Sequence, residues 1–118
     1  MKIAVLLPTL FPDLARGAID SIARALVPFK RAEIVAVSPV QIFGTRVKFV
    51  PEHEPKGVTR AQNVALANTD ADLIIAASDD IRARPDAIEK AVEFLIANEP
   101  PIAPYIVGFN FVQPDQFP

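Results

Sequence analysis

The sequence has no cysteine, a single histidine and only four glycines among its 118 residues. The absence of cysteine excludes disulfide bonds, thiolate metal sites and a cysteine nucleophile. The histidine, His53, lies between Glu52 and Glu54, a setting typical of a solvated loop residue rather than of a base or a metal ligand. The glycine-rich phosphate motifs GxGxxG and GxxxxGK[ST] do not occur. No GxSxG motif marks any serine as a nucleophile.

Clusters of positive charge and long apolar runs are also absent. The formal net charge is −2, and without a basic patch we expect no nucleic acid partner and no anionic membrane surface. No segment approaches the roughly 20 apolar residues of a membrane span. The N-terminal run MKIAVLLPTLF is interrupted by Pro8 and has no small-residue cleavage pattern, so it favours a first β-strand over a signal peptide. We therefore expect a cytoplasmic protein.

The length and the composition indicate one globular domain with a tail. A chain of 118 residues is one domain by length, with 51% hydrophobic and 22% charged residues, and it is long enough to bury a core. The pattern changes after Asn98, so we expect a domain over 1–98 and a proline-rich tail over 99–118. Within this tail, Tyr105–Val112 is a candidate for one more strand at an edge of the sheet.

Four segments are typical of β-strands. Lys2–Leu7 is a continuous apolar run, the pattern of a strand that is covered on both faces. Glu33–Val37 and Asp72–Ala77 are further apolar segments typical of buried strands. Arg46–Val50 is shorter and alternates more between apolar and polar residues.

Three further segments carry apolar residues at helical spacing. The first is Asp13–Leu26. The second runs over 59–68, and Thr59 with Gln62 three residues later forms a capping-box pattern at its start. The third begins at Pro85, a residue favoured in the first turn of a helix. Its buried stripe is expected to consist of Ile88, Ala91, Val92, Leu95 and Ile96.

Strands that alternate with helices indicate βαβ units and a mostly parallel sheet. Right-handed crossovers place the helices on both faces, so we expect a three-layer α/β/α domain. In open sheets of this kind, ligands bind at the carboxyl ends of the strands.

Asp79 and Asp80 follow the apolar run 72–77 and are the strongest candidates for chemistry. Adjacent carboxylates at the end of a parallel strand suit Mg²⁺ or Mn²⁺, which bind hard oxygen ligands and bridge to phosphate oxygens. The alternative is a solvated turn in which an aspartate caps the next helix. The nearby Arg82 and Arg84 either hold a pyrophosphate or offset this local negative charge.

Gly57, Arg60 and Asn63 form a second candidate group. A glycine before a helix lets a ligand approach, and the free N–H groups of the first turn favour anions. Arg60 is suited to a phosphate and Asn63 to a base or a ribose. The alternative is a glycine turn followed by exposed helical side chains.

The order and spacing of these motifs, as far as Asn98, resemble the nucleotide-binding half of family 2 glycosyltransferases with the GT-A fold. VLLPTL is similar to the family's first strand and Pro-Thr turn, and EIVAVS to its second strand. GVTRAQN resembles the family's glycine–x–x–x–Ala–Arg–Asn helix start, with Gly57, Ala61 and Asn63 in matching places. DADLIIAASDDIRARPDAI is similar to the strand, acidic metal motif and helix that follow.

This resemblance implies a truncated GT-A or Rossmann-like sheet of order 3-2-1-4, with an additional edge strand from the tail. It implies a site for a UDP- or GDP-type nucleotide sugar and a divalent cation. Asp80, helped by Asp79, would hold the cation. The implied nucleotide-binding residues are Pro8, Thr9, Leu10, Ser38, Gly57, Arg60, Asn63 and Asp79.

The sequence departs from the family pattern in four places. Ser38-Pro39-Val40 stands where an acidic Asp-Gly-Ser turn is usual, and Gln62 replaces an arginine. Ser78 occupies the place of the first acid of the Asp-x-Asp metal motif. The acceptor half, with its catalytic-base carboxylate, would lie beyond residue 118. No catalytic residue is named for this reason, and a base would have to come from a second copy or a partner chain.

Two functions follow from this pattern. The first is a glycosyltransferase-like enzyme that binds a nucleotide sugar with a metal. The second is a non-catalytic module for nucleotide binding or homo-oligomeric assembly, with the apolar tail Tyr105–Phe117 as the contact. A response-regulator-like domain is a weaker third alternative, because Pro8 and Thr9 stand where that class needs an aspartate.

Overall fold

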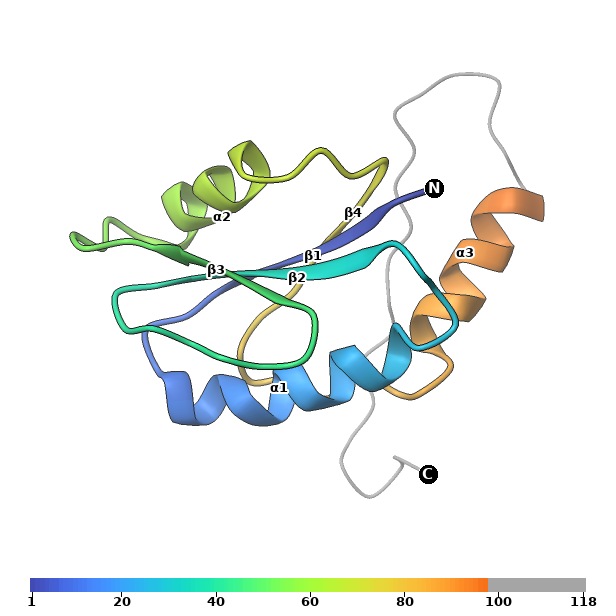
Figure 1. The fold of residues 1–118 in the computed structure, drawn as a ribbon, viewed down its shortest axis with the longest axis horizontal. Helices are drawn as coiled ribbons and strands as arrows, with labels where there is room; N and C mark the ends of the chain where they lie inside the picture. The colour runs from blue at the N-terminus through green and yellow to red at the C-terminus, as the bar shows by residue number, and fades with distance from the viewer. Residues whose placement is uncertain (98–118) are drawn as a thin grey trace.

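The computed structural model describes residues 1–97, and in this range a sheet of four strands lies between two layers of helices. Figure 1 shows α2 on one face of the sheet and α1 on the other, with α3 beyond the end of α1. The strands are β1 (Ile3–Pro8), β2 (Ala32–Ser38), β3 (Val47–Pro51) and β4 (Leu73–Ala76). The helices are α1 (Pro12–Ala25), α2 (Val58–Ala67) and α3 (Ala87–Ala97). The expected tail, with its candidate strand Tyr105–Val112, lies outside the described residues.

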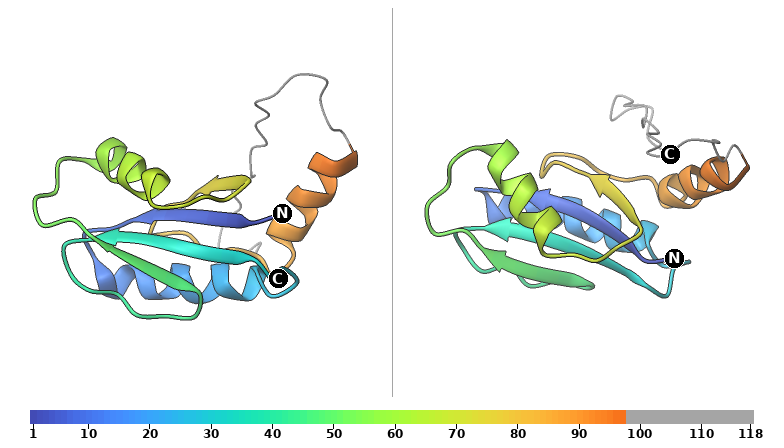
Figure 2. Two further views of the ribbon diagram at one scale, coloured as in Figure 1. Left: turned by 45° about the horizontal axis from the view of Figure 1, so that its top comes forward. Right: turned by 90° about the horizontal axis from the view of Figure 1, so that it is seen from above.

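The strand order is β3-β2-β1-β4, and all pairs are parallel. This confirms the three-layer α/β architecture expected from the sequence and the order 3-2-1-4 that the resemblance implied. Leu6 of β1 is paired with Val35 of β2 and with Ala76 of β4. Because the strands are parallel, their carboxyl ends meet at one side of the sheet, which we call the carboxyl edge. The view from above in Figure 2 shows α2 crossing over this sheet.

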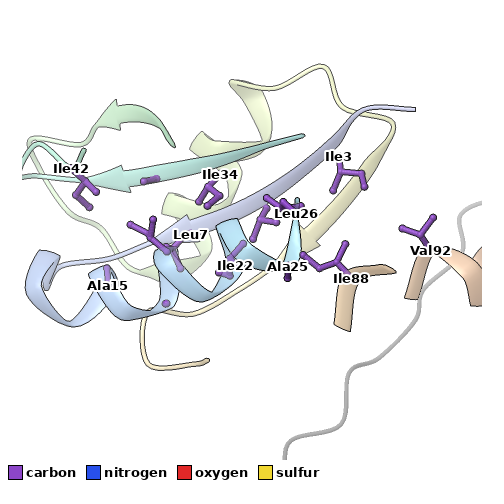
Figure 3. Close-up of a cluster of buried hydrophobic side chains, with 14 residues drawn as sticks. Ile3, Leu7, Ala15, Ile22, Ala25, Leu26, Ile34, Ile42, Ile88 and Val92 are labelled. Atoms are coloured by element: carbon purple, nitrogen blue, oxygen red, sulfur yellow. The ribbon is translucent and has the colours of Figure 1, made fainter. Parts of the chain in front are cut away.

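The core is built around β1, whose six residues are all buried. Alternate residues of β1 face opposite layers. Ile3, Val5 and Leu7 belong to the cluster under α1, and this cluster also includes Ile22, Leu26 and Ile34 (Figure 3). Ala4 and Leu6 belong to the cluster under α2. The continuous apolar run at the start of the chain is thus explained by helices on both faces of this strand.

β4 is less covered than the sequence predicted. Its residues alternate between half-buried and exposed, with Leu73 and Ile75 packed toward the α1 core. Ile74 on the other face is 37% exposed. In the described part of the chain β4 pairs only with β1, and α2 packs on β1 and β2. The predicted strand is present as β4, but the expectation that it is buried was wrong, since its residues are half-buried or exposed.

α2 begins without the predicted capping box. Its N-cap is Gly57, with φ 99° and ψ 164°, and no side chain caps the helix. Thr59 lies inside the first turn, because the glycine turn starts the helix at Val58. Gln62 does not reach back as a cap: its Oε1 atom is buried and accepts no hydrogen bond from the described residues.

α3 begins at Ala87, after a turn in which the Ala87 N–H donates to the Arg84 carbonyl at 3.0 Å. Its buried stripe is narrower than predicted. Ile88 and Val92 are buried, Ala91 and Leu95 are half-buried, and Ile96 is 69% exposed. In residues 1–97, no helix has the length and apolar character needed to cross a membrane.

Charged side chains tie the α2–β4 connection to β1 at the opposite, amino edge of the sheet. The Lys2 ammonium lies 2.6 Å from Asp70 Oδ1 and 3.2 Å from Glu33 Oε1. Thr69 Oγ1 donates to the same Glu33 oxygen at 2.8 Å. The hydrogen bonds with Asp70 and Glu33 raise the pKa of Lys2, and the bond from Lys2 lowers the pKa of Asp70.

We predict that Gly57→Ala destabilises the fold by about 1–3 kcal/mol, because a side chain is strained at this backbone conformation. Space is not the cause, since nothing lies within 4 Å of the place where the Cβ would be. Urea unfolding measures the effect, with Lys56→Ala in the same exposed loop as the control. Equal stability of the Gly57→Ala variant and the wild type would contradict the strain.

The pairing of Lys2 and Asp70 predicts a pH-dependent contribution to stability. Because the folded pKa of Asp70 lies below its ordinary value of 3.8, the contribution is present above that pH and is lost as the pH falls through the folded value. The folded pKa of Lys2 lies above 10.5, so its part is lost only as the pH rises beyond that value.

We therefore expect Asp70→Asn to lower the free energy of unfolding at pH 7 and to lower it less at pH 2. Urea unfolding across this pH range measures the difference, with Glu54→Gln in an exposed loop as the control. A deficit in Asp70→Asn of equal size at both pH values would show that the charge is not its source.

Candidate functional site

The carboxyl edge of the sheet gathers four polar residues, one at or just beyond the end of each strand. Backbone hydrogen bonds join these strand ends: the Thr9 N–H donates to the Val37 carbonyl at 2.9 Å, and the Glu52 N–H donates to the Ser38 carbonyl at 3.0 Å. The Ala77 N–H donates to the Leu6 carbonyl at 3.0 Å and extends the pairing of β4 with β1. The four residues, in the order of their strands, are Thr9, Ser38, Glu52 and Asp79.

Thr9 and Asp79 are in direct contact. The Thr9 hydroxyl donates to Asp79 Oδ2 at 2.7 Å and accepts the Phe11 N–H at 3.0 Å. Thr9 is buried, with 5% of its surface exposed, and Asp79 is half-buried. The Thr9 N–H continues the pairing with β2, so strand alternation from Leu7 places the Thr9 side chain on the α1 face. Asp79, in the turn after β4, reaches the same side through its bond with Thr9. One of the two predicted acidic residues is thereby held by the predicted Pro-Thr turn.

Asp80 is exposed and has a different partner. The Ser78 hydroxyl donates to Asp80 Oδ1 at 2.9 Å, so Ser78 supplies a hydroxyl where the family pattern has an acid. Within residues 1–97, no group of three or more histidine, aspartate or glutamate side chains is placed to hold a metal ion. The oxygen donors are of the kind that Mg²⁺ and Mn²⁺ prefer, and phosphate and water oxygens would have to complete the shell.

The other residues expected at the nucleoside side differ in exposure. Pro8 is buried at the end of β1, whereas Leu10 is 53% exposed. Ser38 is fully buried, and its hydroxyl accepts the Val40 N–H at 3.1 Å. Ser38 therefore supports the turn after β2, while Leu10 offers apolar surface next to Thr9.

Gly57, the N-cap of α2, and Arg60 and Asn63 within this helix are exposed. α2 covers the face of the sheet opposite to α1, as Figure 1 shows. The structure thus separates these three residues from the Thr9–Asp79 pair, which lies on the α1 face. A ligand that contacts both groups has to lie across the carboxyl edge, over the end of β1.

The segment after β4 is held against α1 by contacts that the sequence did not reveal. The Ala83 N–H donates to Ser21 Oγ at 2.9 Å, and this hydroxyl donates to the Ala18 carbonyl at 2.9 Å. The guanidinium of Arg82 lies directly over Gly17. In the sequence, this contact is indicated only by two small residues one turn apart in α1, Gly17 and Ser21.

Glu52 is a further residue at this edge that the sequence pattern did not single out. It follows β3, and its Oε2 atom is buried without a hydrogen-bond partner among the described residues. The adjacent His53 is exposed, as expected of a loop residue.

Two hollows of the described surface lie beside α1 rather than over the acidic pair. One, of about 240 Å³, lies between α1 and the β2–β3 connection. It is lined by Pro12, Arg16, Ile19, Asp20, Gln41, Ile42 and Phe43. A shallower depression is lined by residues 10–14 and includes Leu10. Neither hollow is lined by Asp79 or Asp80.

Comparison with known proteins gives matches among solved structures. No family model matches the sequence, and no curated protein does. Residues 1–349 of TarS from S. aureus match over 84% of this chain, with a TM-score of 0.71 and 19% identity. This TarS fragment has been solved in complex with UDP and with UDP-GlcNAc. The mannosyltransferase PcManGT from Pyrobaculum calidifontis, in complex with GDP-Man and Mn²⁺, matches over 80% of this chain. Its TM-score is 0.68 and its identity is 23%.

The chain spans about a third of these proteins: 33% of the TarS fragment and 32% of PcManGT. Identities at this level establish the fold alone. Together with the parallel strand order 3-2-1-4, they show that the described part of this chain has the fold of the GT-A-type glycosyltransferases.

Proposed function

We propose that this chain binds a nucleotide-diphosphate sugar and a divalent cation at the carboxyl edge, as the donor-binding part of a glycosyltransferase. The observation that carries the proposal is the acidic pair after β4, with Asp79 bonded to Thr9 of the turn after β1. The similar structures support it, because they include TarS with UDP and PcManGT with GDP-Man and Mn²⁺.

The cation is held by Asp80 with help from Asp79. Asp80 is exposed, so a metal ion reaches it from solvent, whereas Asp79 Oδ2 already accepts the Thr9 hydroxyl. When bound, a divalent cation stabilises the negative charge that develops on a departing nucleotide.

The nucleoside lies across the end of β1 in this proposal. Leu10 supplies apolar surface for the base, and Thr9 and the buried Ser38 keep the two turns beneath it in place. Arg60 and Asn63 approach from the α2 side. Gly57 leaves open space there, because nothing lies within 4 Å of the position its Cβ would take.

Sugar transfer also needs a group that removes a proton from the acceptor hydroxyl while the nucleotide diphosphate leaves. We assign no residue of the described range to this role. The chain corresponds to about a third of its structural neighbours, and we propose that the base lies outside it. The apolar tail Tyr105–Phe117, on which the assembly alternative depends, lies outside the described residues.

Metal-dependent nucleotide binding is the central prediction. We expect UDP or GDP to bind the wild type more tightly with Mn²⁺ than without it, as measured by isothermal titration calorimetry. Asp80→Ala should lose at least about tenfold in the affinity measured with Mn²⁺, since it removes a direct ligand of the cation. Its metal-free affinity should change little.

Glu54→Ala is the matched control, because it removes one carboxylate from the exposed β3–α2 loop and leaves the acidic pair intact. Failure of the wild type to bind either nucleotide at millimolar concentration, with or without Mn²⁺, would overturn the proposed function. An equal loss of affinity in Glu54→Ala would show that net charge alone is responsible.

A second prediction concerns the bond between Thr9 and Asp79. Thr9→Val keeps the shape of the side chain and removes two hydrogen bonds, so it should destabilise the fold by about 1–3 kcal/mol. It should also weaken the Mn²⁺-dependent binding. Thr9→Ser retains the hydroxyl and should retain most of the binding. If Thr9→Ser lost as much affinity as Thr9→Val, the methyl group rather than the hydroxyl would be responsible.

A further inference from the structure

We propose that α1 positions the acidic segment, residues 79–83, and that Ser21 and Gly17 are the positioning residues. This inference rests on the proposed function for the identity of the ligand, which binds at Asp79 and Asp80. The contacts that support the inference join residues of this chain to one another and involve no ligand.

Ser21 fixes the far end of the acidic segment. The Ser21 side chain lies in the interior, 7% exposed, and its hydroxyl both donates and accepts a hydrogen bond. It donates to the Ala18 carbonyl within α1 and accepts the Ala83 N–H, both at 2.9 Å. The first bond orients the oxygen and the second connects it to a backbone 62 residues away. An alanine at residue 21 could make neither of these two hydrogen bonds.

Thr9 fixes the near end of the segment. Its hydroxyl bonds Asp79 at 2.7 Å, and Thr9 lies just before the start of α1. Only three residues, Asp80, Ile81 and Arg82, separate the two anchored positions. Ile81 and Ala83 also pack against the α1 core. The backbone that carries Asp80 is therefore anchored on both sides by contacts with Thr9 and Ser21.

Gly17 provides the surface on which Arg82 lies. A Cβ on Gly17 would stand 2.2 Å from Nη2 and 2.4 Å from Cζ of Arg82, which is far inside contact distance. The Arg82 Nη1 also donates to the Ile81 carbonyl at 2.8 Å. A side chain at residue 17 would displace the guanidinium. Because these atoms are the far end of a flexible side chain, a Cβ at residue 17 would move the Arg82 side chain and leave the apolar core in place.

The first test measures the segment without any ligand. Amide hydrogen exchange by NMR should show the Ala83 N–H exchanging about tenfold faster in Ser21→Ala than in the wild type. The amides of β1 and β2 should be unchanged. Ser21→Thr retains the hydroxyl and should retain the protection of Ala83, whereas Arg24→Ala on the exposed side of α1 is the control. Unchanged exchange at Ala83 in Ser21→Ala would overturn the proposal.

The second test measures ligand binding in the same variants by calorimetry with UDP or GDP. Ser21→Ala should weaken the Mn²⁺-dependent binding about tenfold and leave the metal-free affinity near that of the wild type. Faster exchange at Ala83 with unchanged Mn²⁺-dependent affinity would overturn the positioning role and leave the proposed function intact. Absence of binding in the wild type would overturn the proposed function, while the exchange data still decide whether α1 holds the segment.

Gly17→Ala offers a variant that folds even if Ser21→Ala does not, because alanine is favoured over glycine within a helix. We expect an unchanged or higher melting temperature together with an Mn²⁺-dependent affinity lowered several-fold. The double variant Gly17→Ala/Arg82→Ala should bind as Arg82→Ala does, since the displaced group is then absent. An additive loss in the double variant would contradict the proposed contact.

Discussion

The structure depends on the burial of β1 between two strands and two helix layers. All six of its residues are buried, and each face meets a different cluster of apolar side chains. β2 and β4 pair with it on either side in parallel, so the residue that follows β1 is placed in the middle of the carboxyl edge. Thr9 stands at this point. Its neighbours across the sheet are therefore the ends of β2 and β4, and the contact with Asp79 follows from the order of the strands.

The sequence was sufficient to predict the elements whose signals are local. The continuous apolar runs of β1 and β2 identify strands between two helical layers, and the alternation of strands with helices predicts the parallel sheet. Prediction from the sequence failed where burial or a helix start depends on neighbouring parts of the structure. Residues 73–76 are as apolar as a buried strand, yet in the described range only β1 pairs with them. At the start of α2, the capping-box pattern was overridden by Gly57, whose positive φ starts the helix earlier.

In the candidate site, too, the local motifs were predictable from the sequence and the tertiary contacts were not. Asp79, Asp80 and the Pro-Thr turn were recognised because they directly follow apolar runs. Their contacts were not predictable, since Thr9 and Asp79 are 70 residues apart and Ser21 and Ala83 are 62 apart. A buried serine in α1 carries no motif, and its role emerges only when the segment after β4 is placed against it. Local patterns thus identified the acidic group, and the tertiary structure identified what holds it.

The spacing of the acidic residues has a chemical consequence. Asp79 and Asp80 lie in the turn after β4 and bond different partners. The Ser78 hydroxyl donates to Asp80, whereas Asp79 accepts the Thr9 hydroxyl. Where an Asp-x-Asp motif has two carboxylates, this chain has the Ser78 hydroxyl in contact with the Asp80 carboxylate. In the proposed site, a cation at Asp80 would meet less negative charge from the protein, and the phosphates of the proposed nucleotide would supply more of its ligands. Cation and nucleotide binding should consequently be strongly coupled, with each raising the affinity of the other.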